Sequence, residues 1–348
     1  MNWSKTVTKI GTPIKILLGG SPCTKWSIAQ KNGREVLPEG IGWELFENYR
    51  IAKEKFQPDI FLYENNKSAA QPIKDAIYSA LGGGKDSSVR LTHINSALVS
   101  AQNRERFYVT NFGDIEQPED RGILLCDVLE TDWTTDQAKS KNTTAYRLGS
   151  VVPVNTTADG KARTVKAQYY KNGMANFVTN GGYPATGVAI PLHLGTKSII
   201  EIDGKPIYMV NNGLITVKDK QYPIKLADGY YLIRKLTPTE CERLQTLPDG
   251  YTSGVSDTQR YRAIGNGWTA EVIIHILNHA LKDIPRDKEL VVLSMYDGIA
   301  TGRYCLDKMG FTNVKYYAYE IDPYAQKIAM SNYPDIVQCG DAFQIRNF

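Results

Sequence analysis

A cysteine and a glutamate follow two short apolar runs near the amino terminus, and their residue types could support nucleophilic chemistry. Cys23 closes the segment Gly19–Cys23, directly after the apolar run Ile14–Leu18. Glycine and proline hold such a loop open, so the thiol could stand exposed as a nucleophile. Glu64 follows a second run, Asp59–Tyr63. We expect both side chains to face one cleft; the alternative is a small packed cysteine and a solvated carboxylate.

The elements that must position these side chains form an α/β pattern. Trp43–Phe56, between the two runs, has the apolar spacing of a helix. A strand, a helix and a strand at this spacing predict a parallel βαβ unit, whose ligands bind at the carboxyl ends of the strands. The pattern returns later, with predicted strands at Glu289–Leu293, Val314–Tyr319 and Ile336-Val337 and predicted helices starting at Thr237 and spanning Ala270–Leu281.

A glycine-bearing turn, Tyr296–Gly302, follows the third predicted strand, and Glu320 follows the fourth. Glycine lets the backbone approach a nucleoside, and a carboxylate about 20 residues further on accepts hydrogen bonds from ribose hydroxyl groups. The turn lacks the G-x-G-x-x-G arrangement that cradles a pyrophosphate. The pattern therefore favours a cofactor such as S-adenosylmethionine, while a nicotinamide-dependent oxidoreductase stays open as an alternative.

Residues 131–230 differ from both flanks. They are rich in Thr, Val, Tyr, Asn and Gly, and turn signals predict short strands and hairpins at Asp159-Gly160, Asn172-Gly173, Asp203-Gly204 and Asn212-Gly213. This part carries 12 Lys and Arg against 7 Asp and Glu, whereas the whole chain has a net charge of +4. A basic excess in one lobe is typical of a nucleic-acid partner, but a solvated lobe with spare lysines would give the same balance.

The composition fits a globular protein with two domains or one large domain and a lobe. The chain has 348 residues, of which 42% are hydrophobic and 22% charged. No apolar run reaches the roughly 18 residues of a membrane span, and Met1–Lys9 lacks the apolar core of a signal peptide. Five cysteines without a C-x-x-C pair and four histidines without ligand spacing predict neither a disulfide scaffold nor a metal site. We therefore expect a reducing, cytoplasmic compartment.

Several motifs together make the chain resemble the C5-cytosine DNA methyltransferases. The segments that carry this resemblance are Gly19–Cys23 with Trp26-Ser27, Glu64-Asn65, Gln102–Arg106, Arg234–Gln245, Gly265–Trp268 and Leu293–Gly302, the last in a variant typical of the Dnmt3 type. In that family the cofactor motifs normally precede the cysteine loop, whereas here they come last. The chain thus resembles a circularly permuted member in which Asp283–Lys288 joins the old termini.

The resemblance implies a Rossmann-like S-adenosylmethionine-dependent methyltransferase domain of the α/β class, circularly permuted, with an inserted β-rich target-recognition lobe. Residues 1–130 would form the catalytic half, 131–233 the target-recognition domain, and 234–348 the return helices with the cofactor-binding half. It implies methyl transfer to C5 of a cytosine flipped out of double-stranded DNA, through a covalent bond between Cys23 and C6. Restriction–modification, phage protection and regulation are all compatible with such an activity.

The resemblance also assigns roles to residues. Cys23, Glu64, Arg104 and Arg106 would be catalytic, with Glu64 at N3 and the exocyclic amine of the base, and the arginines bracing Glu64, the cytosine carbonyl or a phosphate. The residues expected around the cofactor are Pro22, Leu45, Asn266, Trp268, Tyr296, Asp297, Gly298, Ile299, Ala300, Thr301, Gly302, Glu320, Ile321, Asp322, Asp341 and Ala342. The residues expected to contact DNA are Lys25, Lys31, Arg34, Arg147, Lys161, Arg163 and Lys166, with Gln168, Tyr169 and Tyr170 beside them.

Two further interpretations stay open. An RNA cytosine-C5 methyltransferase of the Dnmt2 kind would share the fold and the mechanism, although the long middle lobe favours duplex DNA. A catalytically silent DNA-binding regulator would have no need for the combination of Cys23, Glu64, Arg104 and Arg106.

Overall fold

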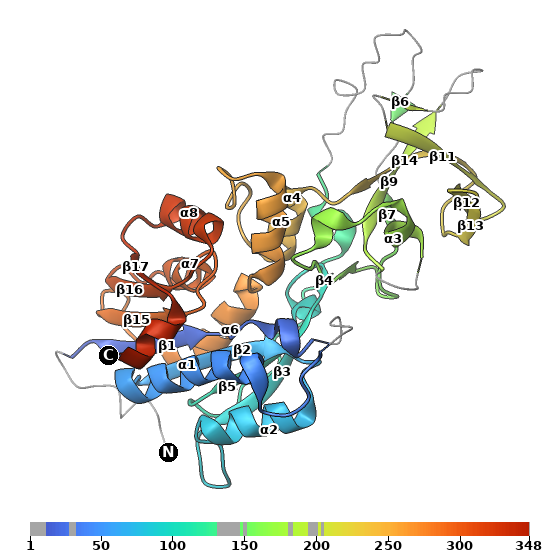
Figure 1. The fold of residues 1–348 in the computed structure, drawn as a ribbon. Coiled ribbons are helices and arrows are strands. Elements are labelled where there is room, and N and C mark those ends of the chain that lie inside the picture. Colours follow the sequence, from blue (N-terminus) through green and yellow to red (C-terminus); the bar gives the residue numbers. More distant parts are fainter. Residues whose placement is uncertain are drawn as a thin grey trace.

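The computed structural model describes residues 12–27, 33–130, 147–148, 152–179, 184–193, 201–202 and 205–347. Within these ranges a seven-stranded sheet carries helices on both faces, and a β-rich lobe projects from one end (Figure 1). None of the helices in the described ranges combines the length and apolar character needed to cross a membrane.

The large sheet has the strand order β17-β16-β15-β1-β2-β5-β3. Neighbouring strands are parallel, except that β5 runs antiparallel to both β2 and β3. The predicted βαβ pattern is thereby confirmed. The strands are β1 (Ile14–Gly19), β2 (Ile60–Asn66), β3 (Arg90–Asn95), β5 (Glu105–Thr110), β15 (Leu290–Met295), β16 (Val314–Tyr319) and β17 (Val337–Gly340).

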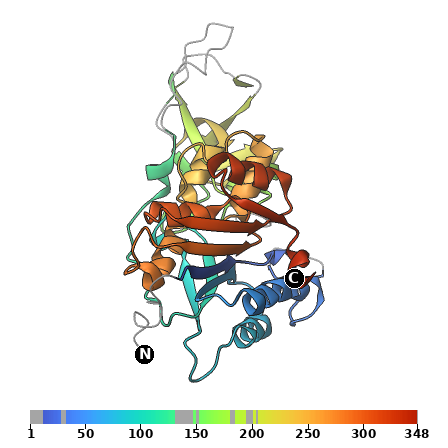
Figure 2. The same cartoon turned by 90° about the vertical axis from the view of Figure 1, so that its left-hand side faces the viewer.

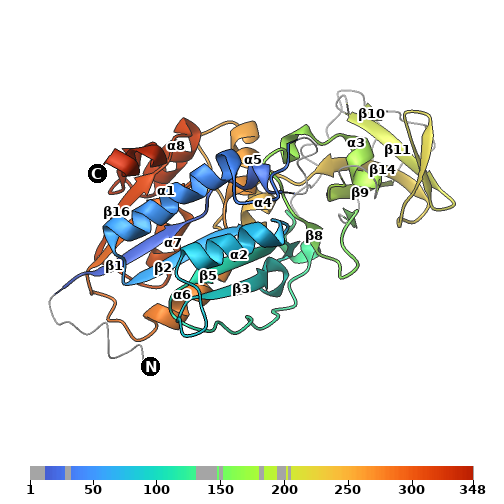
Figure 3. The ribbon, with the colours of Figure 1, turned by 60° about the horizontal axis from the view of Figure 1, so that its bottom comes forward.

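Each face of the sheet has its own apolar core. On one face Leu17 and Phe61 belong to a buried cluster with residues of α1 (Gly40–Phe56) and α2 (Gln71–Ala80), and Figure 3 shows these helices side by side. On the other face the strands pack against α6 (Ala270–Leu281), α7 (Thr301–Lys308) and α8 (Pro323–Asn332). Strands covered on both faces are mainly apolar, which explains the apolar runs in the sequence, and the exposed Lys15 near the start of β1 is an exception.

Strands from the first and the last part of the chain lie side by side in the centre of the sheet. β1 pairs with β15, from Ile14 opposite Leu290 to Gly19 opposite Met295. Figure 2 shows the blue strand from the start of the chain beside the orange and red strands from its end. Residues 283–288 connect α6 to β15 by a turn in which the Lys288 amide donates to the Pro285 carbonyl (3.1 Å).

The lobe is an antiparallel sheet of short strands. Its strands are β6 (Arg147–Leu148), β7 (Val152–Val154), β9 (Gly187–His193), β10 (Glu201–Ile202), β11 (Lys205–Asn211), β12 (Leu214–Val217), β13 (Lys220–Pro223) and β14 (Gly229–Lys235). The β-rich character predicted for this part is confirmed. β14 runs past residue 233 and leads directly into α4 (Pro238–Leu244), which begins at the predicted Thr237 cap.

The predicted turns of the lobe have different outcomes. Asn212 and Gly213, with φ of 50° and 69°, join β11 to β12 in the expected hairpin. The hairpin predicted at Asn172-Gly173 is wrong, because these residues connect the 3₁₀ turn Tyr169–Lys171 to the helix α3 (Met174–Val178). Asp203-Gly204 lies outside the described residues.

Two short strands link the lobe to the segment that precedes it in the chain. β4 (Gln102–Asn103) pairs in parallel with β8 (Ala162–Arg163). The lobe core continues without a break into α4 and α5 (Asp257–Asn266), since Leu244 and Ile264 belong to the same buried cluster as the lobe strands. The remaining 3₁₀ turns are Cys23–Lys25, Ser96–Leu98, Leu125–Val128 and Ala342–Asn347.

Candidate active site

Four neighbouring parallel strands reach one edge of the sheet in register. Gly19 at the end of β1 lies opposite Met295 of β15 and Tyr63 of β2, and Met295 lies opposite Tyr319 of β16. Residues that the sequence singled out for chemistry follow β1, β15 and β16, whereas Glu64 lies within β2, which continues to Asn66 beside β5. The structure thus brings to one edge of the sheet the cysteine loop, Glu64, the glycine-bearing turn and Glu320.

Two glycines let the cysteine loop lie against its neighbours. A Cβ on Gly19 would stand 2.6 Å from the carbonyl oxygen of Met295. A Cβ on Gly20 would stand 2.5 Å from the carbonyl oxygen of Glu64 and 3.0 Å from its Oε2. A side chain at either position would push the loop away from the strands beside it, so the close approach depends on glycine.

A buried polar cluster fastens the loop to β2. Asn65, only 1% exposed, donates from Nδ2 to the carbonyl oxygen of Ser21 (2.9 Å) and to Tyr63 Oη (3.0 Å). Ser21 Oγ and Tyr63 Oη are hydrogen-bonded to each other at 2.7 Å. Sequence reasoning gave Asn65 no separate role, although its place beside Glu64 was the available signal. Its amide holds the loop that carries Cys23.

Cys23 is partly buried at the start of a 3₁₀ turn. Burial raises the pKa of its thiol, and the positive charge of Arg106 opposes this rise. The Glu64 carboxylate raises the pKa further, while the Arg104 guanidinium lowers it. The sulfur therefore lies in one electrostatic environment with the three other predicted catalytic side chains. A raised pKa keeps the thiol protonated at rest, so its reactive thiolate must be favoured by what binds beside it.

The carboxylate of Glu64 is held at both oxygens. Oε1 forms an ion pair with Arg106 Nε at 2.9 Å, and both side chains are largely buried, at 13% and 11% exposed. Oε2 accepts a hydrogen bond from Trp268 Nε1 at 3.1 Å. Guanidinium and indole groups can only donate, so both of them hold the Glu64 carboxylate as an acceptor in a fixed orientation. Arg106 therefore braces Glu64, which was one of the roles predicted for it.

Arg104 directs its hydrogen bonds to backbone carbonyls and not to Glu64. It is 4% exposed and donates to the carbonyl oxygens of Val165 (3.2 Å), Gly265 (3.2 Å) and Gly267 (2.8 Å). Burial, reinforced by the nearby Arg106, lowers the pKa of its guanidinium. Arg104 lies in the break between β4 and β5, and its charge interacts with Glu64 and Cys23 although it forms no hydrogen bond with either. Arg104 ties the lobe to the turn that precedes Trp268.

The turn after β15 has an open, left-handed backbone. Tyr296, Gly298 and Ala300 have φ of 59°, 65° and 61°. Tyr296 Oη donates to the Leu45 carbonyl (2.7 Å) and accepts from Asn48 Nδ2 (3.0 Å), which fixes the ring against α1. A Cβ on Gly298 would meet nothing within 4 Å. A ligand can therefore approach this backbone closely.

Glu320 borders the same turn. Its Oε2 accepts from the Gly298 amide (2.8 Å), and its Oε1 accepts from the amides of Ile321 and Asp322 (2.8 Å each). A carboxylate has about four acceptor positions, so one remains for a hydroxyl group of a ligand. Ile321 is 69% exposed and adds apolar surface beside it.

The other acidic residues predicted around the cofactor bind protein groups. Asp297 is inside the fold, where its Oδ1 accepts from Tyr316 Oη (2.6 Å) and burial raises the pKa of its carboxyl group to about 6. Asp322 caps α8 by accepting from the amide of Tyr324 (2.9 Å). Asp341 Oδ1 accepts from the Phe343 amide (2.9 Å) at the start of the last 3₁₀ turn.

The remaining predicted cofactor residues differ in what they expose. Pro22 and Asn266 are exposed and Leu45 is half-buried. The buried ones, which can offer backbone groups, are Ile299, Ala300, Thr301 and Ala342. Gly302 lets α7 pack on the sheet, since a Cβ there would stand 2.6 Å from Tyr316 Oη and 2.8 Å from a methyl carbon of Leu18.

A family model described as C-5 cytosine-specific DNA methylase matches residues 3–282. The chain belongs to this family. Among its relatives, Type II methyltransferase M.SsoII of Shigella sonnei is 25% identical over 74% of this chain and 62% of its own length. Type II methyltransferase M.HpaII of Haemophilus parainfluenzae is 28% identical, over 74% of this chain and 70% of its own. Type II methyltransferase M1.ScrFI of Lactococcus lactis subsp. cremoris is 26% identical, over 79% and 64%.

The chain spans less than two thirds of the length of two of these methylases, at 62% and 64%. Solved structures resemble it more distantly. The Entamoeba histolytica methyltransferase EhMeth is 14% identical over 78% of each chain, with a TM-score of 0.45.

The basic residues that were predicted to contact DNA lie in varied surroundings. Lys25 is half-buried. Arg34 donates to the carbonyls of Trp26 (3.2 Å) and Ser68 (2.6 Å), tying the segment after the cysteine loop to the turn after β2. Arg163 donates from Nε to the Asn155 carbonyl (3.1 Å). Lys31 and the side chain of Arg147 lie outside the described residues.

The prediction for Lys161 is wrong. Its side chain is buried, at 5% exposed, and its ammonium group donates to the carbonyls of Ala97 (2.5 Å) and Ile123 (2.9 Å). Lys161 therefore holds the lobe against the segment that contains Ala97 and Ile123. Gln102 does the same, since its Oε1 accepts from the Val165 amide (2.7 Å).

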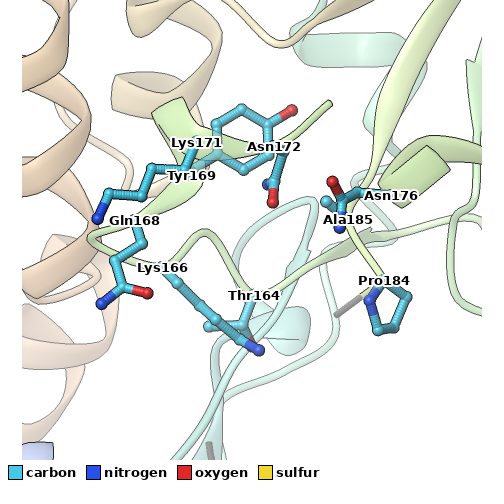
Figure 4. A pocket seen from close by; sticks show the side chains of 9 residues that line it. All are labelled: Thr164, Lys166, Gln168, Tyr169, Lys171, Asn172, Asn176, Pro184 and Ala185. Carbon is cyan, nitrogen blue, oxygen red and sulfur yellow. The ribbon is translucent and has the colours of Figure 1, made fainter. Parts of the chain in front are cut away.

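Lys166 lines a polar hollow in the lobe, about 210 Å³ in volume (Figure 4). In Figure 4, Asn176, Pro184 and Ala185 lie across the hollow from Tyr169 and Asn172. Its lining residues are Thr164, Lys166, Gln168, Tyr169, Lys171, Asn172, Asn176, Pro184 and Ala185. Burial lowers the pKa of Lys166. The Lys166 ammonium group and the amide side chains beside it fit a negatively charged, hydrogen-bonding ligand, whereas the Lys171 ammonium group lies over the Tyr170 ring.

Among the described residues, no group of three or more His, Cys, Asp or Glu side chains could hold a metal ion.

Proposed function

We propose that this protein transfers a methyl group from S-adenosylmethionine to C5 of cytosine in double-stranded DNA. One observation carries the proposal: the aligned ends of β2, β1, β15 and β16, which gather the Cys23 loop, Glu64 and the Tyr296–Gly302 turn at one edge. Membership of the C-5 cytosine-specific DNA methylase family supports the same reaction.

Cytosine C5 is a weak nucleophile, and the proposed chemistry activates it through Cys23. The thiolate adds to C6 and the electron pair of the C5–C6 double bond shifts to C4–C5, while the C4–N3 pair moves onto N3. C5 thereby becomes an enamine-like carbon. Glu64 hydrogen-bonds or protonates N3 and accepts from the exocyclic amine, which offsets the charge that builds on the ring. When bound, S-adenosylmethionine supplies an electrophilic methyl group on a sulfonium sulfur. Loss of the C5 proton and departure of the Cys23 thiolate then restore the ring.

The residues present fit S-adenosylmethionine. The open backbone at Gly298 accepts close approach, Tyr296 offers a fixed aromatic ring, and Glu320 retains an acceptor position for a ribose hydroxyl. Exposed Ile321 offers apolar surface for the adenine. Glu320→Ala is expected to weaken S-adenosylmethionine binding at least about 10-fold by calorimetry, as hydrogen bonds to charged groups contribute about 1.5–3 kcal/mol. Unchanged affinity would remove Glu320 from the site.

We also propose that the chain is a circularly permuted member of its family. The family match ends at residue 282, before β15, β16 and β17, which supply the turn and Glu320. Residues 283–288 form a short turn between α6 and β15, which is suited to joining two former termini.

Duplex DNA as substrate requires the target cytosine to leave the base stack, because a pocket at a sheet edge cannot reach a paired base. The lobe would then read the sequence, with the Lys166 hollow as one contact. We propose action in a bacterial or phage-infected cytoplasm, in line with relatives such as Orphan methyltransferase M.SPRI of Bacillus phage SPR.

The deciding experiment compares methyl transfer to duplex DNA and to tRNA, with bisulfite sequencing of DNA from cells that express the chain. Wild type is expected to methylate cytosine in duplex DNA in a fixed sequence context. Cys23→Ala is expected to abolish turnover while S-adenosylmethionine binding persists. Substantial residual turnover by this variant would exclude Cys23 as the nucleophile, and transfer to tRNA alone would replace DNA by RNA as the substrate.

A further inference from the structure

We propose that Trp268 is a positioning residue for Glu64, whose indole N–H fixes the carboxylate in the orientation that meets the base. The inference rests on the proposed function and deepens it. It gives Trp268 a part in base activation in addition to the cofactor contact expected from the sequence.

The two donors on Glu64 act on different oxygens. Arg106 Nε holds Oε1 at 2.9 Å and Trp268 Nε1 holds Oε2 at 3.1 Å. Oε2 is also the oxygen that faces the cysteine loop, since a Cβ on Gly20 would stand 3.0 Å from it. The oxygen held by the indole is thus the one on the side of the proposed nucleophile.

A single donor would leave the carboxylate free to turn. The terminal torsion of glutamate is broad, so an ion pair at Oε1 alone permits rotation of the second oxygen. A second donor on Oε2 fixes the plane of the group. Indole suits this task because it is rigid and can only donate. The site needs such an orientation before the base arrives, as misplacement of a reacting group by about 1 Å can cost roughly 100-fold in rate.

The backbone on both sides of Trp268 is itself anchored. The Gly267 carbonyl accepts from Arg104 (2.8 Å) and from Gln245 Nε2 (3.3 Å), and Thr269 Oγ1 donates to Gln245 Oε1 (2.8 Å). Arg104 and Gln245 are both buried. Arg104 therefore acts on Glu64 through the Trp268 turn, which explains why a buried arginine lies here without contacting the carboxylate.

The ring of Trp268 packs against the apolar core that includes Ile299 and Ala300 of the cofactor turn. A residue that served only as a wall of the cofactor site would act through this packing, and phenylalanine would largely replace it. A residue that positions Glu64 acts through the N–H, which phenylalanine lacks. Trp268→Phe therefore distinguishes the two roles, because it keeps the packing and removes the N–H.

The test is the kinetics of Trp268→Phe with duplex DNA and S-adenosylmethionine. We expect kcat to fall about 10-fold, equivalent to about 1.4 kcal/mol, while KM for S-adenosylmethionine stays within about 2-fold. Trp43→Phe is the matched control, because Trp43 packs on Phe46 in α1 with ring centroids 4.7 Å apart, and its kcat is expected to equal that of wild type.

A second measurement follows bond formation at C6 directly. In DNA that carries 5-fluorocytosine no C5 proton is available for removal, so the adduct with Cys23 accumulates and its rate can be read on a denaturing gel. Trp268→Phe is expected to slow this rate by the same factor as kcat. Trp268→His restores a ring N–H and is expected to be faster than Trp268→Phe, which keeps the test decisive if Trp268→Phe folds poorly.

The outcomes are distinct. A raised KM for S-adenosylmethionine with kcat unchanged, or a histidine variant no faster than the phenylalanine variant, would overturn the positioning role. A wild-type protein that transfers no methyl group to DNA would instead overturn the proposed function.

Discussion

The hydrogen bonds of Asn65 make the attachment of the cysteine loop open to a quantitative test. Asn65→Ala removes the bonds from Nδ2 to the Ser21 carbonyl (2.9 Å) and to Tyr63 Oη (3.0 Å), and the bond from the Asn66 amide to Oδ1 (2.8 Å). Each contributes about 1 kcal/mol, and buried partners left unsatisfied cost about 1–3 kcal/mol, so we expect a loss of about 2–4 kcal/mol in unfolding free energy.

The effect on activity should exceed the effect on cofactor binding. Loosening the loop displaces Cys23 relative to Glu64, and we expect single-turnover methyl transfer to duplex DNA to slow at least about 10-fold. The affinity for S-adenosylmethionine should stay within about 3-fold, because the turn after β15 and Glu320 do not depend on Asn65. Urea unfolding, single-turnover kinetics and calorimetry measure the three quantities.

Asn111→Ala is the matched control for this prediction. Asn111 Oδ1 accepts from the Phe61 amide (2.8 Å) and its Nδ2 donates to the Asp59 carbonyl (2.9 Å), so it secures the opposite end of the same strand. We expect it to lower stability by a comparable amount with methyl transfer near the wild-type rate. If both variants slowed transfer equally at matched stability, loop attachment would not explain the loss.

Three further predictions follow from packing, burial and charge. Gly302→Ala places a Cβ 2.6 Å from Tyr316 Oη, and we expect urea unfolding to show a loss of about 1–3 kcal/mol; wild-type stability would contradict the packing argument. Burial raises the pKa of Asp297 to about 6, so its neutral form stabilises the fold at low pH and this contribution is lost as pH rises through 6. Asp297→Asn is therefore expected to match wild type at pH ~4 and to exceed it at pH ~8 by up to about 3 kcal/mol in urea unfolding, and equal stability at both values would refute this. Lys166→Ala is expected to weaken DNA binding and to lower the slope of log K against log salt by about 1, whereas an unchanged slope would exclude a phosphate contact.

The strands, and the chemically important residues beside them, were predictable because local sequence patterns determine both. Mainly apolar runs such as Ile14–Leu18, in which Lys15 is the one polar residue, indicate strands covered on both faces, and the residues after them must lie at the sheet edge. The helix start at Thr237 was equally legible, since the Thr237 side chain accepts from the Glu240 amide (3.1 Å) and Glu240 Oε2 accepts from the Thr237 amide (2.8 Å).

The sequence also contained a signal that our prediction left unused. Asp322 followed by Pro323 is typical of a helix start, and α8 begins there with Asp322 as its cap. A capping residue accepts from backbone amides, which accounts for what the Asp322 carboxylate does in the structure.

Other features depend on contacts between distant segments, which no local pattern encodes. The spacing of Arg104 and Arg106 did not show that the strand breaks at Arg104 or that its guanidinium donates to carbonyls of the lobe and of the turn before Trp268. Lysine is seldom buried, so nothing near Lys161 indicated that three carbonyls enclose its ammonium group. The contact between Trp268 and Glu64 joins the turn after α5 to the end of β2.

The pairing of β1 with β15 has a consequence for biosynthesis. During translation β1 leaves the ribosome early, yet the strand that covers one of its edges follows only at Leu290–Met295. Until then the nascent chain carries an unpaired apolar edge, which invites association with other chains. Contacts this far apart in sequence also slow folding. The order of the segments therefore leaves a newly made chain with an open strand edge that the finished molecule covers.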